Sequence, residues 1–211
     1  NVWFHSKSEE EDITTNHPWQ IAPPLLEDHY NFEDALMVGL MMITLLKHAD
    51  RVKIACLAQL VNVIAPIMTE PDGKAWRQTI YYPFLHASRY GRGVVLQPLL
   101  DGPAHETVEH GMVSDIVSVA VYNEEKEELT IFAVNRNISE DVSLKADVRS
   151  FAGYQILEHL VLANDDLKAE NGPDGENVAP VTVQDGILDA GELEIPLKKA
   201  SWNVIRLGLQ K

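Results

Sequence analysis

Residues 52–62 constrain the fold of this chain more than any other stretch of its sequence. They read Val52-Lys53-Ile54-Ala55-Cys56-Leu57-Ala58-Gln59-Leu60-Val61-Asn62, an almost unbroken apolar run whose end carries the neutral amides Gln59 and Asn62. Such a run predicts a strand that is buried on both faces, as in a parallel sheet covered by helices. A sheet of that kind needs several strands, and only one is recognisable here. The sequence therefore predicts the tail of a larger α/β structure.

The rest of the chain divides into a helical part and a strand-rich part. A helix is predicted from Glu33 to Ala49, apolar nearly all round, with Asn31 as its N-cap and Asp34 three residues on. A second helix is predicted from about Arg77 to Tyr90. From residue 93 onward short alternating segments predict an antiparallel sandwich: 94–96, 116–122, 129–135, 142–148, 154–162, 181–183, 193–195 and 202–207. We expect domains at 1–95 and 96–211.

Composition excludes several classes of protein. The net charge of -15 opposes binding to nucleic acid, because affinity there comes mainly from Lys and Arg neutralising phosphates. No apolar run reaches the ~20 residues that a membrane span requires, so no membrane partner is expected. The start, Asn1 to His5, does not resemble a signal peptide, and the single Cys56 cannot form an internal disulfide. We expect a cytoplasmic protein in which Cys56 is a small core residue or, alternatively, the wall of a ligand pocket.

Most familiar catalytic and metal-binding motifs are missing from the sequence. There is no nucleophile elbow, phosphate-binding glycine loop or cysteine metal site. His105 and His110 are five residues apart, whereas two zinc ligands on one helical face need a spacing of four, so we expect an exposed polar loop there. The acidic runs Glu9 to Asp12 and Glu124 to Glu128 are typical of solvated surface. No cofactor is expected.

Neutral amides and aromatic residues remain as candidates for a binding site. They are Asn1, Trp3, Phe4, Gln59, Asn62, Trp76, Tyr81 and Tyr82. An amide both donates to and accepts from hydroxyl groups, and indole faces pack on the C–H surface of a sugar, so this set suits a neutral polyhydroxyl ligand. The alternative is structural: Gln59 would satisfy backbone groups and Trp3 would belong to the core.

Several segments, in order along the chain, resemble the family 51 α-L-arabinofuranosidases. They are Asn1 to His5, Pro18 to Asp28, Phe32 to Leu36, Ala55 to Ile64, Gln78 to Phe84 and Ser201 to Gly208. The resemblance implies the last part of a catalytic (β/α)8 barrel followed by a jelly-roll-like β-sandwich. It also implies an exo-acting enzyme that removes arabinose side chains from arabinan or arabinoxylan, with Trp3 and Gln59 as substrate contacts.

The same resemblance places the catalytic residues outside this chain. The family uses one Glu as acid/base and another as nucleophile, ~5 Å apart, in a retaining mechanism. By comparison with the family motif, the nucleophile lies two residues before Asn1 and the acid/base lies further upstream. We therefore expect no catalytic residue in this chain and no hydrolase activity of the chain alone. The expected partners are arabinose-containing oligosaccharides, further copies in a homo-oligomer, and the preceding part of the same enzyme. The alternative is a noncatalytic carbohydrate-binding or structural sandwich module.

Overall fold

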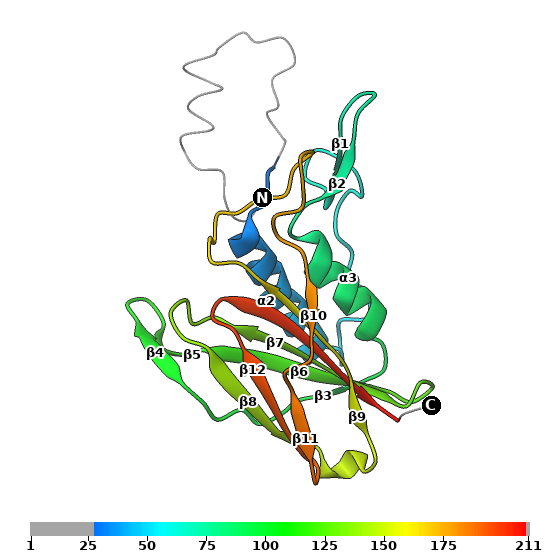
Figure 1. Ribbon diagram of the computed structural model, residues 1–211, viewed down its shortest axis with the longest axis vertical. Helices are drawn as coiled ribbons and strands as arrows, with labels where there is room; N and C mark the ends of the chain where they lie inside the picture. The colour runs from blue at the N-terminus through cyan, green and yellow to red at the C-terminus, as the bar shows by residue number, and fades with distance from the viewer. Residues whose placement is uncertain (1–27, 210–211) are drawn as a thin grey trace.

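The structure, a computed structural model, describes residues 28–209 and arranges them in three layers (Figure 1). Two helices lie on one face of a six-stranded sheet, and a three-stranded sheet lies on the other face. Every strand ladder among the described residues is antiparallel. This part of the protein is therefore mostly β-sheet, with few helices.

The elements have the following bounds. The helices are α2 (Phe32–Lys47) and α3 (Tyr81–Tyr90). The six-stranded sheet has the order β10 (Val181–Val183), β9 (Gln155–Ala163), β13 (Ser201–Gly208), β7 (Glu128–Asn135), β6 (Ile116–Asn123) and β3 (Val94–Leu96). The three-stranded sheet has the order β11 (Ile187–Asp189), β12 (Glu192–Leu197) and β8 (Val142–Asp147), with a 3-10 turn (Arg149–Phe151) after β8. Two separate hairpins are β1 (Ile67–Thr69) with β2 (Ala75–Arg77) and β4 (Ala104–Thr107) with β5 (Gly111–Ser114).

Helix α2 begins where the sequence predicts it. The Asn31 side chain accepts from the Asp34 N–H at 3.2 Å, and the Asp34 carboxylate accepts from the Asn31 N–H at 2.9 Å, which makes a reciprocal capping box. Helix α3, in contrast, begins at Tyr81 and not near Arg77. The residues before it are committed elsewhere, because β2 pairs with β1 and the Gln78 N–H donates to the Pro66 carbonyl at 2.8 Å.

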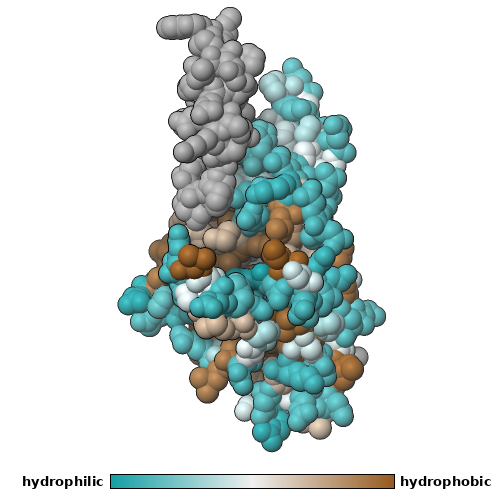
Figure 2. Space-filling model, turned by 90° about the vertical axis from the view of Figure 1, so that its left-hand side faces the viewer, coloured by the Kyte–Doolittle hydropathy of each residue, from teal (hydrophilic) through white to brown (hydrophobic). Residues whose placement is uncertain are grey.

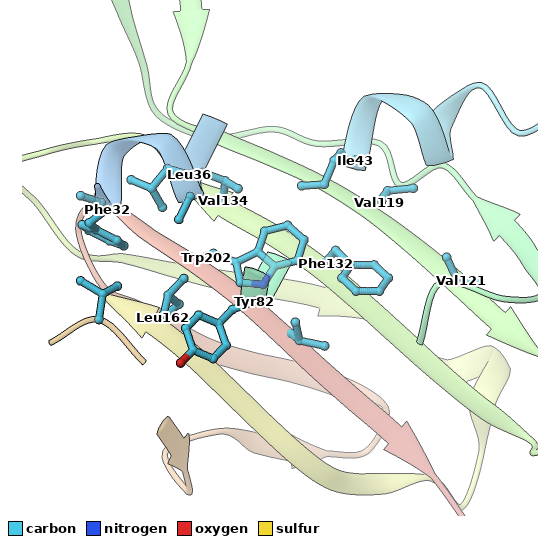
Figure 3. Close-up of a cluster of buried hydrophobic side chains, with 14 residues drawn as sticks. Phe32, Leu36, Ile43, Tyr82, Val119, Val121, Phe132, Val134, Leu162 and Trp202 are labelled. Atoms are coloured by element: carbon cyan, nitrogen blue, oxygen red, sulfur yellow. The ribbon is translucent and has the colours of Figure 1, made fainter. Parts of the chain in front are cut away.

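The central strands β6, β7 and β13 are buried on both faces. Alternate residues of β13 show this: Trp202 and Val204 belong to the core under the helices, while Ile205 and Leu207 belong to the core between the sheets. Trp202 is fully buried and stacks on Phe132 with ring centroids 5.6 Å apart (Figure 3). Burial on both faces explains why these antiparallel strands read as nearly continuous apolar runs.

Trp202 also ties both helices to the sheet. Its indole Nε1 donates to Nδ1 of His86 in α3 at 3.0 Å. In α2, Gly39 lies so close that a Cβ there would be 2.6 Å from a carbon of the indole ring. The helices and the six-stranded sheet thus share one hydrophobic core, centred on Trp202.

The predicted antiparallel sandwich is confirmed, and its strands fall close to the expected segments. The acidic run Glu124 to Glu128 forms the hairpin turn between β6 and β7 and the start of β7, and residues 124–127 are exposed, as expected of solvated surface. Three short strands were not expected among the later residues, namely β4, β5 and β11. His105 lies in β4 and His110 in the turn that follows, so the exposed polar segment forms a hairpin rather than a loop.

The prediction of a strand over residues 52–62 is wrong for the structure described. The segment is coil and largely exposed, with Ile54 81% and Leu60 68% accessible. Within residues 28–209, the N–H groups of residues 53–61 donate no backbone hydrogen bond, whereas those of Val52 and Asn62 donate to the carbonyls of His48 and Ile67. A strand requires neighbouring strands, and among residues 28–209 the only pairing of this segment is a single parallel bridge between Val61 and Ile67 of β1. The barrel portion of the predicted fold is therefore not seen in this part of the chain.

The exterior agrees with the acidic composition. The face shown in Figure 2 is mostly hydrophilic, with hydrophobic residues gathered in patches across its middle. Within residues 28–209, neither helix has the length and apolar character needed to cross a lipid bilayer.

Candidate functional site

Gln59 lies in an open hollow that the end of the 52–62 segment forms with α3. The hollow has a volume of about 540 Å3, and its walls include Cys56, Leu57, Tyr81, Phe84 and Leu85. The Gln59 amide is exposed and has no side-chain hydrogen-bond partner among residues 28–209. It is therefore not tied to backbone groups in this part of the protein, and it remains available to bind another group.

Cys56 lies on the wall of the same hollow and is exposed. The expectation that it is a core residue is wrong, because the predicted strand around it does not form in the described structure. The thiol occupies the position that the alternative interpretation gave it, on the wall of a hollow.

Asn62, the second amide of the segment, has a structural role. Its Oδ1 accepts from the Thr69 N–H at 2.7 Å, and its Nδ2 donates to Thr69 Oγ1 at 2.9 Å. The amide thus joins the end of the segment to the first strand of the β1–β2 hairpin. Gln59, Asn62 and Val63 adopt positive φ angles of 56°, 61° and 61°, a conformation that is unfavourable for a β-branched residue such as Val63.

The aromatic candidates separate into different surroundings. Tyr81 is half-buried and lines the Gln59 hollow, while Tyr82 is buried in the core under the helices. Trp76, in β2, lines a second hollow together with residues of the loop after β9. Asn1, Trp3 and Phe4 lie outside the residues that the structure describes, as does the acidic run Glu9 to Asp12.

A cluster around Glu176 connects the sandwich to the helical part, and sequence analysis did not anticipate it. Arg77 donates to both oxygens of Glu176, at 2.7 and 3.0 Å, and the Tyr82 hydroxyl donates to the same carboxylate at 2.6 Å. The Arg77 guanidinium also lies 5.8 and 5.7 Å from the ring centres of Tyr81 and Tyr82. Because 99 residues separate Arg77 from Glu176, no local pattern signals this pair.

The electrostatics of this cluster favour a charged carboxylate. Partial burial opposes ionisation of Glu176, but the hydrogen bonds from Tyr82 and Arg77 outweigh that effect and hold its pKa below the ordinary value. Burial and the bond to Glu176 raise the pKa of Tyr82, which stays a neutral donor. The cluster is therefore a structural contact, called here the Arg77–Glu176 latch, between the segment 77–82 and the loop after β9. It is not a proton-transfer group at neutral pH.

The other carboxylates and histidines named from the sequence have structural positions where they are described. Asp34 caps α2, Glu128 pairs with Arg206 at 2.7 Å, and His105 contacts Asp115 at 2.5 Å. Residues 28–209 contain no group of three or more His, Cys, Asp or Glu side chains placed to hold a metal ion.

Comparison with known proteins identifies the family. A family model described as the α-L-arabinofuranosidase C-terminal domain matches residues 1–201. The chain is 63% identical over 209 residues to the intracellular exo-α-(1→5)-L-arabinofuranosidase of Acetivibrio thermocellus, with 99% of this chain and 42% of that protein covered. It is 57% identical over 208 residues to the enzyme of the same name from Halalkalibacterium halodurans, with 99% and 41% covered. The chain thus spans about two fifths of the length of these relatives.

Solved structures agree with this result. A family 51 α-L-arabinofuranosidase from Bifidobacterium longum has a TM-score of 0.81 and 38% identity, covering 90% of this chain and 38% of that one. An α-L-arabinofuranosidase from Thermotoga maritima, solved with arabinose, has a TM-score of 0.74 over 90% of this chain and 41% of that one; at 23% identity it shows the shared fold alone. The resemblance to family 51 is confirmed, and the chain belongs to the α-L-arabinofuranosidase C-terminal domain family.

Proposed function

We propose that this chain is the C-terminal part of a retaining, exo-acting α-L-arabinofuranosidase. The observation that carries the proposal is the 63% identity across 99% of the chain to an enzyme named for that activity. The names of the relatives support an intracellular exo-acting enzyme for α-(1→5)-linked arabinofuranosyl units. We propose arabinan or arabinoxylan as the polysaccharide that carries them. As part of the same proposal, the complete enzyme forms a homo-oligomer.

On this proposal, residues 28–209 belong to the enzyme but do not include its two catalytic carboxylates. In a retaining glycosidase one carboxylate forms the glycosyl-enzyme and a second donates and then accepts the proton. We propose that both belong to the preceding part of the complete enzyme, as the family resemblance suggests. The chain alone is therefore expected to have no hydrolase activity, and the preceding part of the polypeptide is its obligatory partner.

The 52–62 segment is where we propose that the preceding part docks. Its apolar side chains are largely exposed, the N–H groups of residues 53–61 have no backbone acceptor among residues 28–209, and it borders the Gln59 hollow and another hollow of about 570 Å3 next to α2. Added strands would pair this backbone and cover these side chains, which completes a barrel wall. On this proposal residues 1–95 belong to the catalytic barrel and residues 96–211 to the sandwich.

Gln59 and Trp3 are the proposed substrate contacts. In a parallel barrel, ligands bind at the carboxyl ends of the strands, and Gln59 lies near the end of the proposed strand. Its amide is exposed and unpaired among the described residues, which suits a contact to sugar hydroxyls better than a structural role.

Two measurements test this function. Full-length enzyme is expected to hydrolyse 4-nitrophenyl α-L-arabinofuranoside, and the 211-residue chain of verified mass is not. In the full-length enzyme, Gln59→Ala should lower kcat/KM by about 5- to 150-fold, equivalent to ~1–3 kcal/mol, with little change in unfolding by urea. An inactive full-length enzyme whose sandwich still binds arabinan would favour the noncatalytic module instead. Unchanged kinetics with lowered stability would show that Gln59 is a structural amide.

A further inference from the structure

A second hollow, separate from that of Gln59, lies between the β1–β2 hairpin and the loop of residues 164–178. We call it the loop hollow. Its walls are His29, Trp76, Glu170, Asn171, Asn177 and the turn Gly172–Gly175, which includes Asp174, and its volume is about 380 Å3. Figure 1 shows the hairpin and this loop projecting together from the end of the molecule furthest from β11. The loop hollow therefore combines residues from the helical part and from the sandwich.

The walls of the loop hollow are held in place by contacts on both sides. Arg77, next to Trp76, makes the two hydrogen bonds to Glu176, and the Lys74 ammonium donates to the Pro173 carbonyl at 2.9 Å. Asn171 donates to the Arg77 and Val178 carbonyls at 3.0 and 2.8 Å. A ligand that entered would meet walls that are already ordered, which lowers the entropy cost of binding.

The walls carry an indole, an imidazole, two amides and the carboxylates of Glu170 and Asp174, and no Lys or Arg of the described residues lines them. His29 is exposed and its ring has no hydrogen-bond partner among residues 28–209, and the Trp76 indole N–H is buried without an acceptor there, so Trp76 offers the hollow its ring rather than its N–H. The nearby cations are already engaged, since Arg77 pairs with Glu176 and Lys74 lies 3.9 Å from Asp174. An indole face, amides and carboxylates that accept hydrogen bonds, with no cation in the described wall, suit the hydroxyl groups of a sugar and do not suit a phosphate or another anion.

The turn Gly172–Gly175 keeps the hollow open. The two glycines exchange backbone hydrogen bonds of 3.0 and 3.2 Å across the turn. A Cβ added at either glycine would meet nothing within 4 Å, so this side of the turn faces open space. The loop hollow can therefore admit a ligand without first moving the turn.

The loop hollow is linked to the Gln59 hollow by a short path through the structure. Trp76 is two residues from Gln78, whose N–H donates to the carbonyl of Pro66, and Pro66 lines the Gln59 hollow. The Asn62–Thr69 contacts fix the same hairpin to the end of the 52–62 segment. Both hollows therefore belong to the same end of the proposed barrel.

We propose that the loop hollow binds the neutral sugar units that adjoin the terminal arabinofuranose of an arabinan chain, with Trp76 and His29 as their contacts. This inference rests on the proposed function, because it assigns a further part of the substrate to the same enzyme. It gives the sandwich a direct part in substrate selection, since Asn171, Asn177 and the turn come from its loop.

The test compares a long and a short substrate in the full-length enzyme. Trp76→Ala and His29→Ala should each raise KM for α-(1→5)-linked arabinotriose by about tenfold, the effect of losing one contact worth ~1.4 kcal/mol. The same variants should leave KM for 4-nitrophenyl α-L-arabinofuranoside within about twofold, because the aryl substrate has no further sugar unit. Trp76→Phe keeps an aromatic face and should retain most of the affinity for arabinotriose.

Matched controls separate binding from folding. His110→Ala removes an exposed histidine from the β4–β5 hairpin, and Tyr154→Ala removes a half-buried aromatic residue from the sandwich; neither residue lines the loop hollow. Neither should change the ratio of the two KM values. The inference would be overturned if Trp76→Ala raised KM equally for both substrates, or if it left KM for arabinotriose unchanged. Failure of unmodified full-length enzyme to cleave the aryl substrate would instead overturn the proposed function.

Discussion

Two regions of this protein are equally apolar in sequence and opposite in structure. Strands β7 and β13 are buried on both faces, between the helices on one side and the three-stranded sheet on the other. Residues 53–60, with a similar content of apolar side chains, are coil and mostly exposed. The difference lies in the available neighbours, because a strand gains its hydrogen bonds and its burial from other strands and layers. An apolar sequence thus indicates that a segment can be buried in a sheet, but it does not show whether the neighbouring strands and layers that would bury it are present.

The largest effect is expected at the centre of the buried region. Trp202→Ala removes a fully buried indole that contacts α2, α3 and Phe132, and it should lower the free energy of unfolding by about 3–5 kcal/mol. Leu60→Ala, in the exposed segment, should change the stability of the 211-residue chain by less than about 0.5 kcal/mol. Urea unfolding of both variants measures the contrast. Similar losses for the two would contradict it.

Acid should weaken the same core through His86. Burial, with a smaller effect of the nearby Arg89, lowers the pKa of His86 from 6.5 to about 4. Below pH 6.5 the unfolded chain binds a proton that the folded chain does not, so this contribution to stability is present above that pH and is lost as the pH falls to about 4. The expected total is at most about 3 kcal/mol.

The variant His86→Gln isolates this contribution, because Gln keeps an acceptor for the Trp202 indole but does not titrate in this range. Urea unfolding at several pH values between 4 and 7 should show a shallower loss of stability for the variant than for the unmodified protein. Parallel curves for the two proteins would show that His86 is not the group responsible.

A smaller effect is expected from crowding against Trp202. In Gly39→Ala the new Cβ would lie 2.6 Å from the indole ring, and overpacking of this kind costs about 1–3 kcal/mol. Ala has a higher helix propensity than Gly, which offsets about 1 kcal/mol of that cost, so the free energy of unfolding should fall by about 1 kcal/mol. Gly102→Ala is the matched control, because its Cβ would meet nothing within 4 Å. Thermal unfolding that ranks the two variants in the opposite order would contradict the packing described here.

Local chemistry made part of the fold predictable. The Asn31 cap and Asp34 lie within one helical turn of each other, so the start of α2 could be predicted. The alternation of apolar and polar side chains predicted most strands of the sandwich. The start of α3 was mispredicted, because hairpin pairing of Ala75–Arg77 overrides helix propensity there. The Arg77–Glu176 latch joins residues 99 positions apart and leaves no local signal. Of the two candidate contacts, Gln59 is placed in a hollow by the structure, whereas Trp3 lies outside the described residues and its role remains a prediction.

Hydrogen exchange of residues 52–62 tests the central claim most directly, because it reports whether this segment gains strand partners from the preceding part of the enzyme. In the 211-residue chain, the amides of residues 53–61 should exchange rapidly while those of β7 and β13 are protected, since only the latter have hydrogen-bonded neighbours. In the full-length enzyme, protection of residues 53–61 should rise to the level of those strands. Rapid exchange of the segment in both proteins would contradict the account.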